Sequence, residues 1–140
     1  EPTVAPMPME AVVAIKTLAH WIATGIPLAL VSPILWIMLQ GPPEQSGIVA
    51  VAALVGSLAF FFFGSIGAAL AAGMRRGGLL IALVTLPLYV PTMIFGAATL
   101  DAAASGADWV GPLMLTGSAA LFGIATSPFG AAMALRTALD

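Results

Sequence analysis

Residues 45–74 read QSGIVAVAALVGSLAFFFFGSIGAALAAGM and contain no charged side chain. A helix rises about 1.5 Å per residue, so about 20 residues cross the roughly 30 Å of hydrocarbon in a bilayer. Lipid offers no hydrogen-bond partner to an open backbone, so such a run must fold as a helix. Three further uncharged runs are long enough: Thr17–Gly41, Gly77–Leu100 and Trp109–Leu135. The sequence therefore predicts an all-α, polytopic membrane helix bundle with four transmembrane helices.

The composition agrees with a chain whose solvent is lipid. Hydrophobic residues make up 61% of the sequence and charged residues only 7%, whereas a soluble domain carries about 25% charged residues. Four Lys and Arg residues give no basic patch for nucleic acid. We expect a cytoplasmic segment over residues 1–16 and a transmembrane domain over 17–140, with spans near 18–39, 48–74, 77–100 and 110–135.

The basic residues predict the orientation of the bundle. Lys16 precedes the first span, Arg75 and Arg76 separate the second from the third, and Arg136 follows the fourth. With four spans, these three places lie on one side of the membrane. Because cytoplasmic loops carry the excess of Lys and Arg, both ends of the chain are predicted to be cytoplasmic.

The sequence contains few residues that could form a catalytic or metal-binding site. There is no cysteine, no phosphate-binding loop motif and a single histidine, His20, so no metal cluster or catalytic triad can be assembled within the chain. We therefore expect no enzyme activity and no tightly bound cofactor or metal. His20 lies one helical turn after Lys16 at the start of the first span. It is either an interfacial histidine or a weak candidate ligand for haem iron.

Two acidic residues lie between the third and fourth predicted spans. Asp101 and Asp108 are separated by small residues, and a carboxylate pair is the sharper interpretation of them. The more ordinary interpretation is that both are solvated acids of a loop and that Asp108 caps the fourth helix. We expect the second arrangement.

Prolines interrupt the predicted spans. Pro27 lies in the first span, and Pro87 and Pro91 lie on either side of Tyr89 in the third. Each proline removes a helical hydrogen bond and bends the helix. These positions are either passive bends or a pivot at a translocation path, as in the broken helices of transporters.

Two short segments outside the spans also carry signals. Pro8 suits the first position of a helix and Glu10 its positive end, so Met9–His20 is predicted as a helix. That helix either lies at the interface or docks a cytoplasmic partner. Residues 73–78 read GMRRGG, a predicted cytoplasmic hairpin that includes Arg75, Arg76, Gly77 and Gly78.

Small residues recur every four positions in two of the predicted spans, a pattern that allows close helix packing in membranes. The two stripes are Gly64, Ala68 and Ala72, and Ala119, Gly123, Ser127 and Ala131. They are interpreted as bundle packing or, alternatively, as a face for a second copy of the chain.

Three sequence blocks together resemble the haem exporter B (CcmB) family of bacterial cytochrome c maturation. The similarity runs through nearly all 140 residues, and it is the occurrence of the three blocks in order that is specific. The blocks are PMPME (6–10) with KTLAHW (16–21) and TGIPL (24–28), then RRGGLL (75–80), then LPLYVP (86–91) with IFG (94–96).

The resemblance implies a membrane (permease) subunit of an ABC transporter in the bacterial inner membrane, corresponding to the C-terminal four of six spans. It implies a separate cytoplasmic ATPase, a haem-handling membrane protein, a haem chaperone and a second copy of the subunit as partners. By analogy, Pro8, Met9, Glu10 and Lys16 belong to the coupling helix that receives the ATPase stroke. Two activities are open: the transporter moves haem itself, or it does mechanical work that releases the haem-loaded chaperone.

Two alternative functions remain open. One is an ABC permease of similar architecture that exports another substrate, and the other is a membrane scaffold without ATP coupling. The blocks around His20 and Tyr89 argue against the first alternative. The scaffold predicts that substitutions between Pro8 and Lys16 leave complex assembly and function intact.

Overall fold

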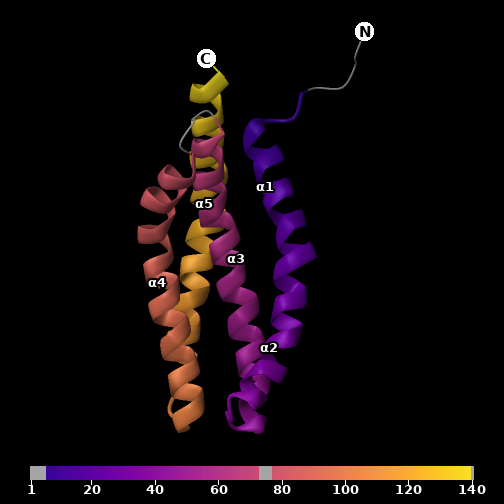
Figure 1. The fold of residues 1–140 in the computed structure, drawn as a ribbon, viewed down its shortest axis with the longest axis vertical. Helices are drawn as coiled ribbons and strands as arrows, with labels where there is room; N and C mark the ends of the chain where they lie inside the picture. Colours follow the sequence, from indigo (N-terminus) through magenta and orange to yellow (C-terminus); the bar gives the residue numbers. More distant parts are fainter. Residues whose placement is uncertain (1–5, 73–76, 140) are drawn as a thin grey trace.

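The computed structural model describes residues 6–72 and 77–139, and every regular element in these two ranges is helical. Figure 1 shows the helices as long rods. The first three elements follow one another end to end and together form one of them, which we call the first rod. In chain order the elements are α1 (Met9–His20), the π-helical η1 (Trp21–Gly25), α2 (Ile26–Met38), the 3-10 turn η2 (Pro43–Gln45), α3 (Ser46–Ala71), α4 (Gly77–Ser105) and α5 (Val110–Leu139).

Four stretches are long and apolar enough to cross a membrane, which confirms the predicted all-α bundle of four spanning helices. The helix expected over Met9–His20 is also confirmed, although Pro8 is the residue before its first turn rather than part of it. The four stretches are Met9–Met38, Pro43–Ala71, Thr85–Ser105 and Val110–Thr137.

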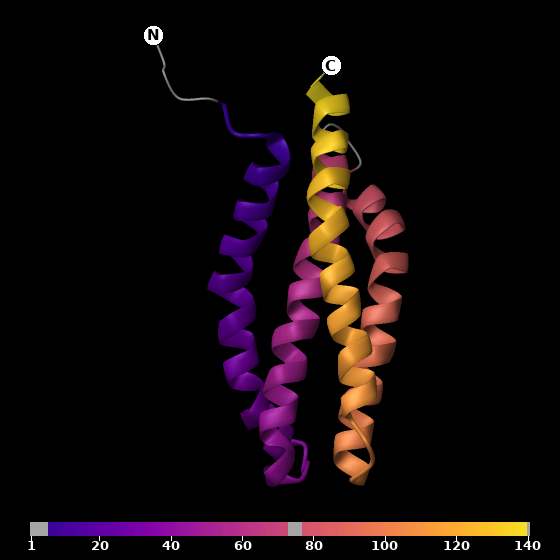
Figure 2. The ribbon, with the colours of Figure 1, turned by 180° about the vertical axis from the view of Figure 1, so that it is seen from behind.

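Helix α3 is the centre of the bundle. It packs against α2, α4 and α5, and α5 also contacts α1. Figures 1 and 2 show α1 and α2 on one side of α3 and α4 on the other. The first rod and α4 therefore flank α3 and leave one of its faces without a covering helix.

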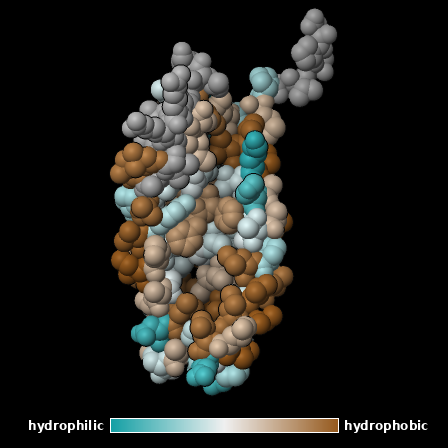
Figure 3. All heavy atoms as spheres, in the orientation of Figure 1, coloured by the Kyte–Doolittle hydropathy of each residue, from teal (hydrophilic) through white to brown (hydrophobic). Residues whose placement is uncertain are grey.

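The interior of the bundle is built from small and hydroxyl-bearing residues. The largest side chains that are completely enclosed are four threonines and a serine, while many leucines, isoleucines and methionines point outward. Figure 3 shows hydrophobic side chains over most of one face. Lipid solvates large apolar side chains as well as a protein interior does, so close packing of small residues holds the helices together. The enclosed residues are Thr85, Thr92, Thr99, Thr116 and Ser127.

The two small-residue stripes have different surroundings. On α5, Gly123, Ser127 and Ala131 are buried, in agreement with a packing role. On α3, Ala68 and Ala72 are exposed, whereas Gly64 is half-buried beneath the Tyr89 hydroxyl. That difference leaves the α3 stripe on the uncovered face.

The first rod contains a π-helical turn that the sequence did not predict. The Ile26 N–H donates to the Trp21 carbonyl, five residues back. Pro27 follows directly; its ring would clash with the carbonyl four residues earlier in a regular α-helix. Such single-turn π segments widen a helix locally. Here the widened turn places Trp21 over Gly25, where an added Cβ would lie 2.8 Å from the indole Nε1.

At the end of the bundle away from the termini, one expectation is wrong. Asp101 is not in a loop: α4 continues through it to Ser105, because the following alanines favour the helix. The helix stops at Gly106, which has a φ of 73°, and Ala107 N–H donates to the Ala102 carbonyl at 2.8 Å. Asp108 caps α5 as expected by accepting the Val110 N–H at 3.0 Å.

The predicted cytoplasmic hairpin is only partly described. Arg75 and Arg76 lie outside the described residues. Gly77 and Gly78 belong to the first turn of α4 rather than to a connecting loop, which corrects that part of the expectation.

Candidate functional site: a groove beside α3

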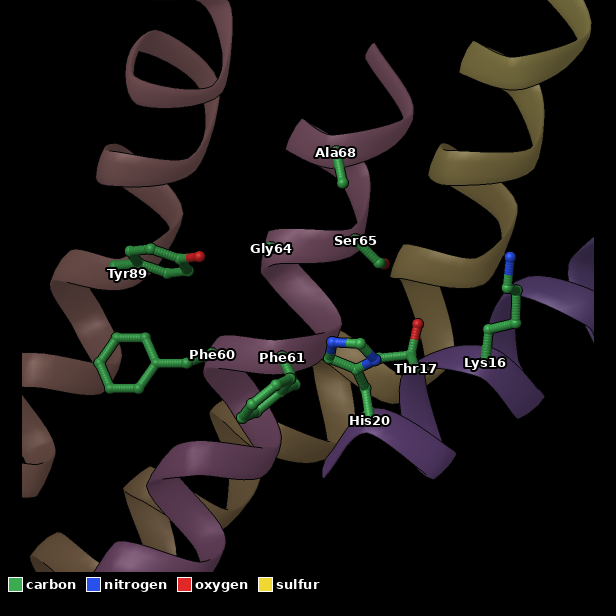
Figure 4. A pocket seen from close by; sticks show the side chains of 9 residues that line it. All are labelled: Lys16, Thr17, His20, Phe60, Phe61, Gly64, Ser65, Ala68 and Tyr89. Carbon is green, nitrogen blue, oxygen red and sulfur yellow. The ribbon is translucent and has the colours of Figure 1, made fainter. Parts of the chain in front are cut away.

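A pocket of about 430 Å³ lies between α1, α3 and α4, and we call it the boundary pocket. Figure 4 shows its side chains arriving from three helices toward the uncovered face of α3. It is lined by Lys16, Thr17, His20, Phe60, Phe61, Gly64, Ser65, Ala68 and Tyr89.

The depth of the boundary pocket follows from helix length. About 20 residues cross the hydrocarbon. Counting that number from Met38 and Ser46, where α2 ends and α3 begins on the side away from the termini, places the opposite boundary near His20 and Ser65. The boundary pocket therefore lies where hydrocarbon meets the headgroup region, at the end of the bundle that holds both termini (Figure 1).

Two basic side chains stand on one wall of this pocket. Lys16 and His20 are both exposed, and neither has an ion pair or hydrogen bond within the part of the chain that the structure describes. The His20 ring lies 6.2 Å from the Phe61 ring, centroid to centroid. In Figure 4 the Lys16 side chain points upward, away from the His20 ring. The expected placement of these two residues on one helical face is confirmed.

Tyr89 forms the opposite wall. Its ring meets Phe60 edge to face, with a centroid distance of 4.8 Å and an interplanar angle of 84°. Its hydroxyl lies over Gly64 of the α3 small-residue stripe. The stripe therefore serves as the floor of a pocket, a role that its spacing in the sequence did not indicate.

The prolines expected to act with Tyr89 lie elsewhere. Pro87 and Pro91 are exposed on α4 and do not line the pocket, and Pro27 is exposed on α2, one residue after the π turn. Because an α-helix turns about 100° per residue, positions two apart face nearly opposite ways. The structure thus separates Tyr89 from both of its proline neighbours, and a pivot at these prolines stays a prediction.

A second pocket of about 430 Å³ continues along α3 toward the other end of the bundle, and we call it the apolar pocket. Phe60 lines both pockets and stands between them. Figure 3 shows a hollow on this face of the molecule. The apolar pocket is lined by Leu28, Ser32, Val49, Ala52, Ala53, Gly56, Ser57, Phe60, Thr92, Met93, Gly96, Ala97 and Leu100.

Thr92, on the wall of the apolar pocket, carries a buried hydroxyl oxygen that has no hydrogen-bond partner among residues 6–72 and 77–139. Thr99, two turns further along the same face of α4, donates to the Phe95 carbonyl at 2.8 Å, as threonines in membrane helices usually do. Thr92 is the exception among the described buried side chains.

The residues expected to couple to an ATPase gather at the end of the bundle. Pro8 directly precedes α1 and Met9 begins it, and the Glu10 carboxylate accepts a hydrogen bond of 2.7 Å from the Arg136 guanidinium at the end of α5. This ion pair joins residues 126 positions apart and fixes the start of α1 to α5. Lys16, two turns further on, belongs to the boundary pocket instead.

Across residues 6–72 and 77–139, no three His, Cys, Asp or Glu side chains come close enough to hold a metal ion. The pockets offer apolar surface, the aromatic rings of Phe60, Phe61 and Tyr89, a few hydroxyls and one basic pair.

Comparison with known proteins identifies the family. Residues 2–138 match the family model described as CcmB protein. Three relatives named "Heme exporter protein B" are similar over 96% of this chain: those of Paracoccus denitrificans, Rhodobacter capsulatus and Escherichia coli (strain K12), at 46%, 45% and 40% identity. The chain spans 62%, 62% and 61% of their lengths. This four-helix membrane chain belongs to the CcmB protein family.

Proposed function

We propose that this chain is the membrane-embedded part of a permease subunit in an ABC transporter for c-type cytochrome biogenesis. A separate subunit hydrolyses ATP, and the transporter uses that energy for haem export or for release of a haem-loaded chaperone. The family match and the "Heme exporter protein B" name of the relatives support this proposal. The observation that carries it is the groove beside α3, which is bounded by the first rod with its π-helical turn and by the proline-containing α4.

The start of α1 is the proposed contact with the ATPase. Pro8, Met9 and Glu10 lie at the end of the bundle where the positive-inside rule predicts the cytoplasm. A push on this segment would be transmitted to α5 through the Glu10–Arg136 pair and, along α1, to His20. Two copies of the subunit, a haem-handling membrane protein and the chaperone complete the proposed assembly.

The groove offers a place for a flat, apolar molecule with acidic groups. Its basic pair suits carboxylates and its aromatic and aliphatic walls suit a macrocycle, which supports haem as the species handled. His20 is the candidate iron ligand, since it is the only imidazole in the sequence. Release of the chaperone without passage of haem through the groove is the second form of the proposal.

The decisive experiment is a haem-stained gel of membrane and periplasmic proteins from cells that lack the full-length gene, with and without a plasmid copy. We expect the covalently attached cytochromes c to vanish with the gene and return with the plasmid. Unchanged bands would refute the maturation function and favour a permease for another substrate. Copurification of the ATPase subunit with the plasmid-encoded protein separates either kind of permease from a scaffold without ATP coupling.

A further inference from the structure

We infer that the groove beside α3 is a binding site for one anionic phospholipid, with its headgroup in the boundary pocket and an acyl chain in the apolar pocket. The inference does not rest on haem export; it fits the second form of the proposed function, in which the chaperone is released without passage of haem through the groove. It starts from a cation that has no partner in the described chain and that stands where the headgroups of the bilayer lie.

Charge is the first argument. Outside residues 73–76, the chain has two Lys or Arg residues, Lys16 and Arg136, and Arg136 is engaged by Glu10. Lys16 has no ion pair within the described residues, yet its aliphatic stem runs along the boundary pocket and its ammonium reaches toward the headgroup region. Basic pockets between transmembrane helices on the cytoplasmic side bind anionic lipid headgroups. A phosphate at this position gives Lys16 the counter-ion that the described chain does not provide.

Hydrogen bonding is the second argument. His20, one turn deeper on the same wall, can donate an imidazole N–H to a phosphate oxygen, and the Tyr89 hydroxyl can donate from the opposite wall. Neither group has a hydrogen bond within the described residues. Lys16, His20 and Tyr89 therefore line one pocket at the boundary of the hydrocarbon, with Lys16 one turn nearer the headgroups than His20.

The shape of the groove is the third argument. The boundary pocket and the apolar pocket share Phe60, and the second pocket runs from Phe60 toward Leu100 along α3 and α4. Each volume is about 430 Å³, within the range of about 300–1,000 Å³ that is usual for ligand sites. A pocket with polar groups at the interface, next to an apolar pocket that runs along the helices, matches a lipid headgroup with its attached acyl chain.

The test uses the natural full-length protein, purified in mild detergent and studied by native mass spectrometry. Phosphatidylglycerol and phosphatidylcholine with identical acyl chains are titrated separately. We expect one phosphatidylglycerol to bind at least about fivefold more tightly than phosphatidylcholine, as one or two charge contacts near a membrane surface would give. In Lys16→Met/His20→Phe, which keeps the apolar stem and the ring, that preference should disappear. Arg136→Gln, which removes a cation at the same end of the bundle but outside the groove, should keep it.

A second variant tests whether the apolar pocket binds the acyl chain, and it leaves the charged residues unchanged. A Cβ at Gly96 meets nothing within 4 Å, so Gly96→Leu can place its side chain into the apolar pocket that Gly96 lines. We expect it to weaken long-chain phosphatidylglycerol about tenfold, the loss that follows when a few methylenes are left without apolar contact, and to leave a short-chain analogue unaffected. Gly111→Leu is the matched control, because Gly111 is equally open and lies outside both pockets.

Three results would overturn the inference: equal binding of the two lipids by the unaltered protein, unchanged preference in Lys16→Met/His20→Phe, or unchanged long-chain binding in Gly96→Leu. Haem is added as a competitor. If haem binding depends on Lys16 and His20 while phosphatidylglycerol binding does not, the groove is a haem site and the lipid inference is wrong. Cytochrome c levels are read separately, so loss of lipid binding and loss of the export function are distinguishable.

Discussion

The Trp21 indole N–H donates a hydrogen bond of 3.0 Å to the Ser57 hydroxyl, which ties the π-helical turn of the first rod to α3. Ser57 in turn donates to the Leu54 carbonyl of its own helix at 3.0 Å. The hydroxyl is thus both donor and acceptor, and the indole, which needs an acceptor when it is buried, finds it inside the bundle. This contact holds α1 and α2 against α3 beside the groove.

Gly25→Ala should break this arrangement. An added Cβ would lie 2.8 Å from the indole Nε1 and 3.1 Å from the Ser57 hydroxyl, so the tryptophan must move and lose its partner. We expect stability in detergent to fall by about 1–3 kcal/mol, the usual cost of an overpacked site. Gly47→Ala is the control: its Cβ would meet nothing within 4 Å, and helix propensity alone should make it neutral or slightly stabilising. Equal stability of the two variants would show that the tryptophan is not held there.

Exchanging the charges of Glu10 and Arg136 should separate structure from partner binding. The pair is partly exposed, with 23% of the Glu10 side chain and 53% of the Arg136 side chain accessible, so Glu10→Arg should cost little stability. We expect the double variant Glu10→Arg/Arg136→Glu to regain the stability that is lost in Glu10→Arg. Copurification of the ATPase should stay low in both variants, because the acidic side chain is proposed to face the partner. Recovery of copurification in the double variant would mean that Glu10 acts only through Arg136.

Pro87→Ala with Pro91→Ala should impair cytochrome c maturation while leaving expression normal. Alanine restores the missing backbone N–H groups and removes the clash of each ring with the preceding turn, so α4 loses its pivot. Maturation is measured by haem staining against protein abundance. Pro112→Ala is the control, since Pro112 lies in the first turn of α5, where a missing N–H costs little. Unchanged cytochrome c levels in the double variant would rule out the pivot and leave the prolines as passive bends.

Thr92→Val should stabilise the protein. The substitution keeps the shape of the side chain and removes a buried hydroxyl that has no partner among the described residues. An unsatisfied buried polar group costs about 1–3 kcal/mol, so we expect a rise of that order in stability in detergent. Thr99→Val is the comparison, because it removes a hydroxyl that donates to Phe95 and should be neutral or destabilising. A loss of stability in Thr92→Val equal to that in Thr99→Val would mean that the Thr92 hydroxyl has a partner.

Much of the fold was predictable because lipid imposes a simple rule. Uncharged runs of sufficient length must be helical, and the four runs found in the sequence correspond to the four stretches of the structure. Local signals were also legible: Asp108 caps α5 as expected. The sequence does not indicate that α4 extends through Asp101. A charged residue marks the end of the apolar run, but the helix itself can continue beyond the hydrocarbon.

The site was only partly predictable. Lys16 and His20 share a face by helical spacing, and the structure places them on one wall of the boundary pocket. Tyr89 was singled out together with Pro87 and Pro91, yet only Tyr89 faces the groove. The proline signal is local, whereas the direction of a side chain depends on which neighbour the helix packs against.

The sequence by itself determined the helical class, the number of spans and the placement of both termini at one end, since each follows from the length of apolar runs and the parity of crossings. Only the tertiary structure decided that α3 occupies the centre and that His20 and Tyr89 face each other across its small-residue stripe. The tertiary structure also decided the π turn and the Glu10–Arg136 pair. The physical reason is that an apolar helix satisfies its own backbone in lipid without help, but which faces meet depends on the packing of side chains far apart in the chain.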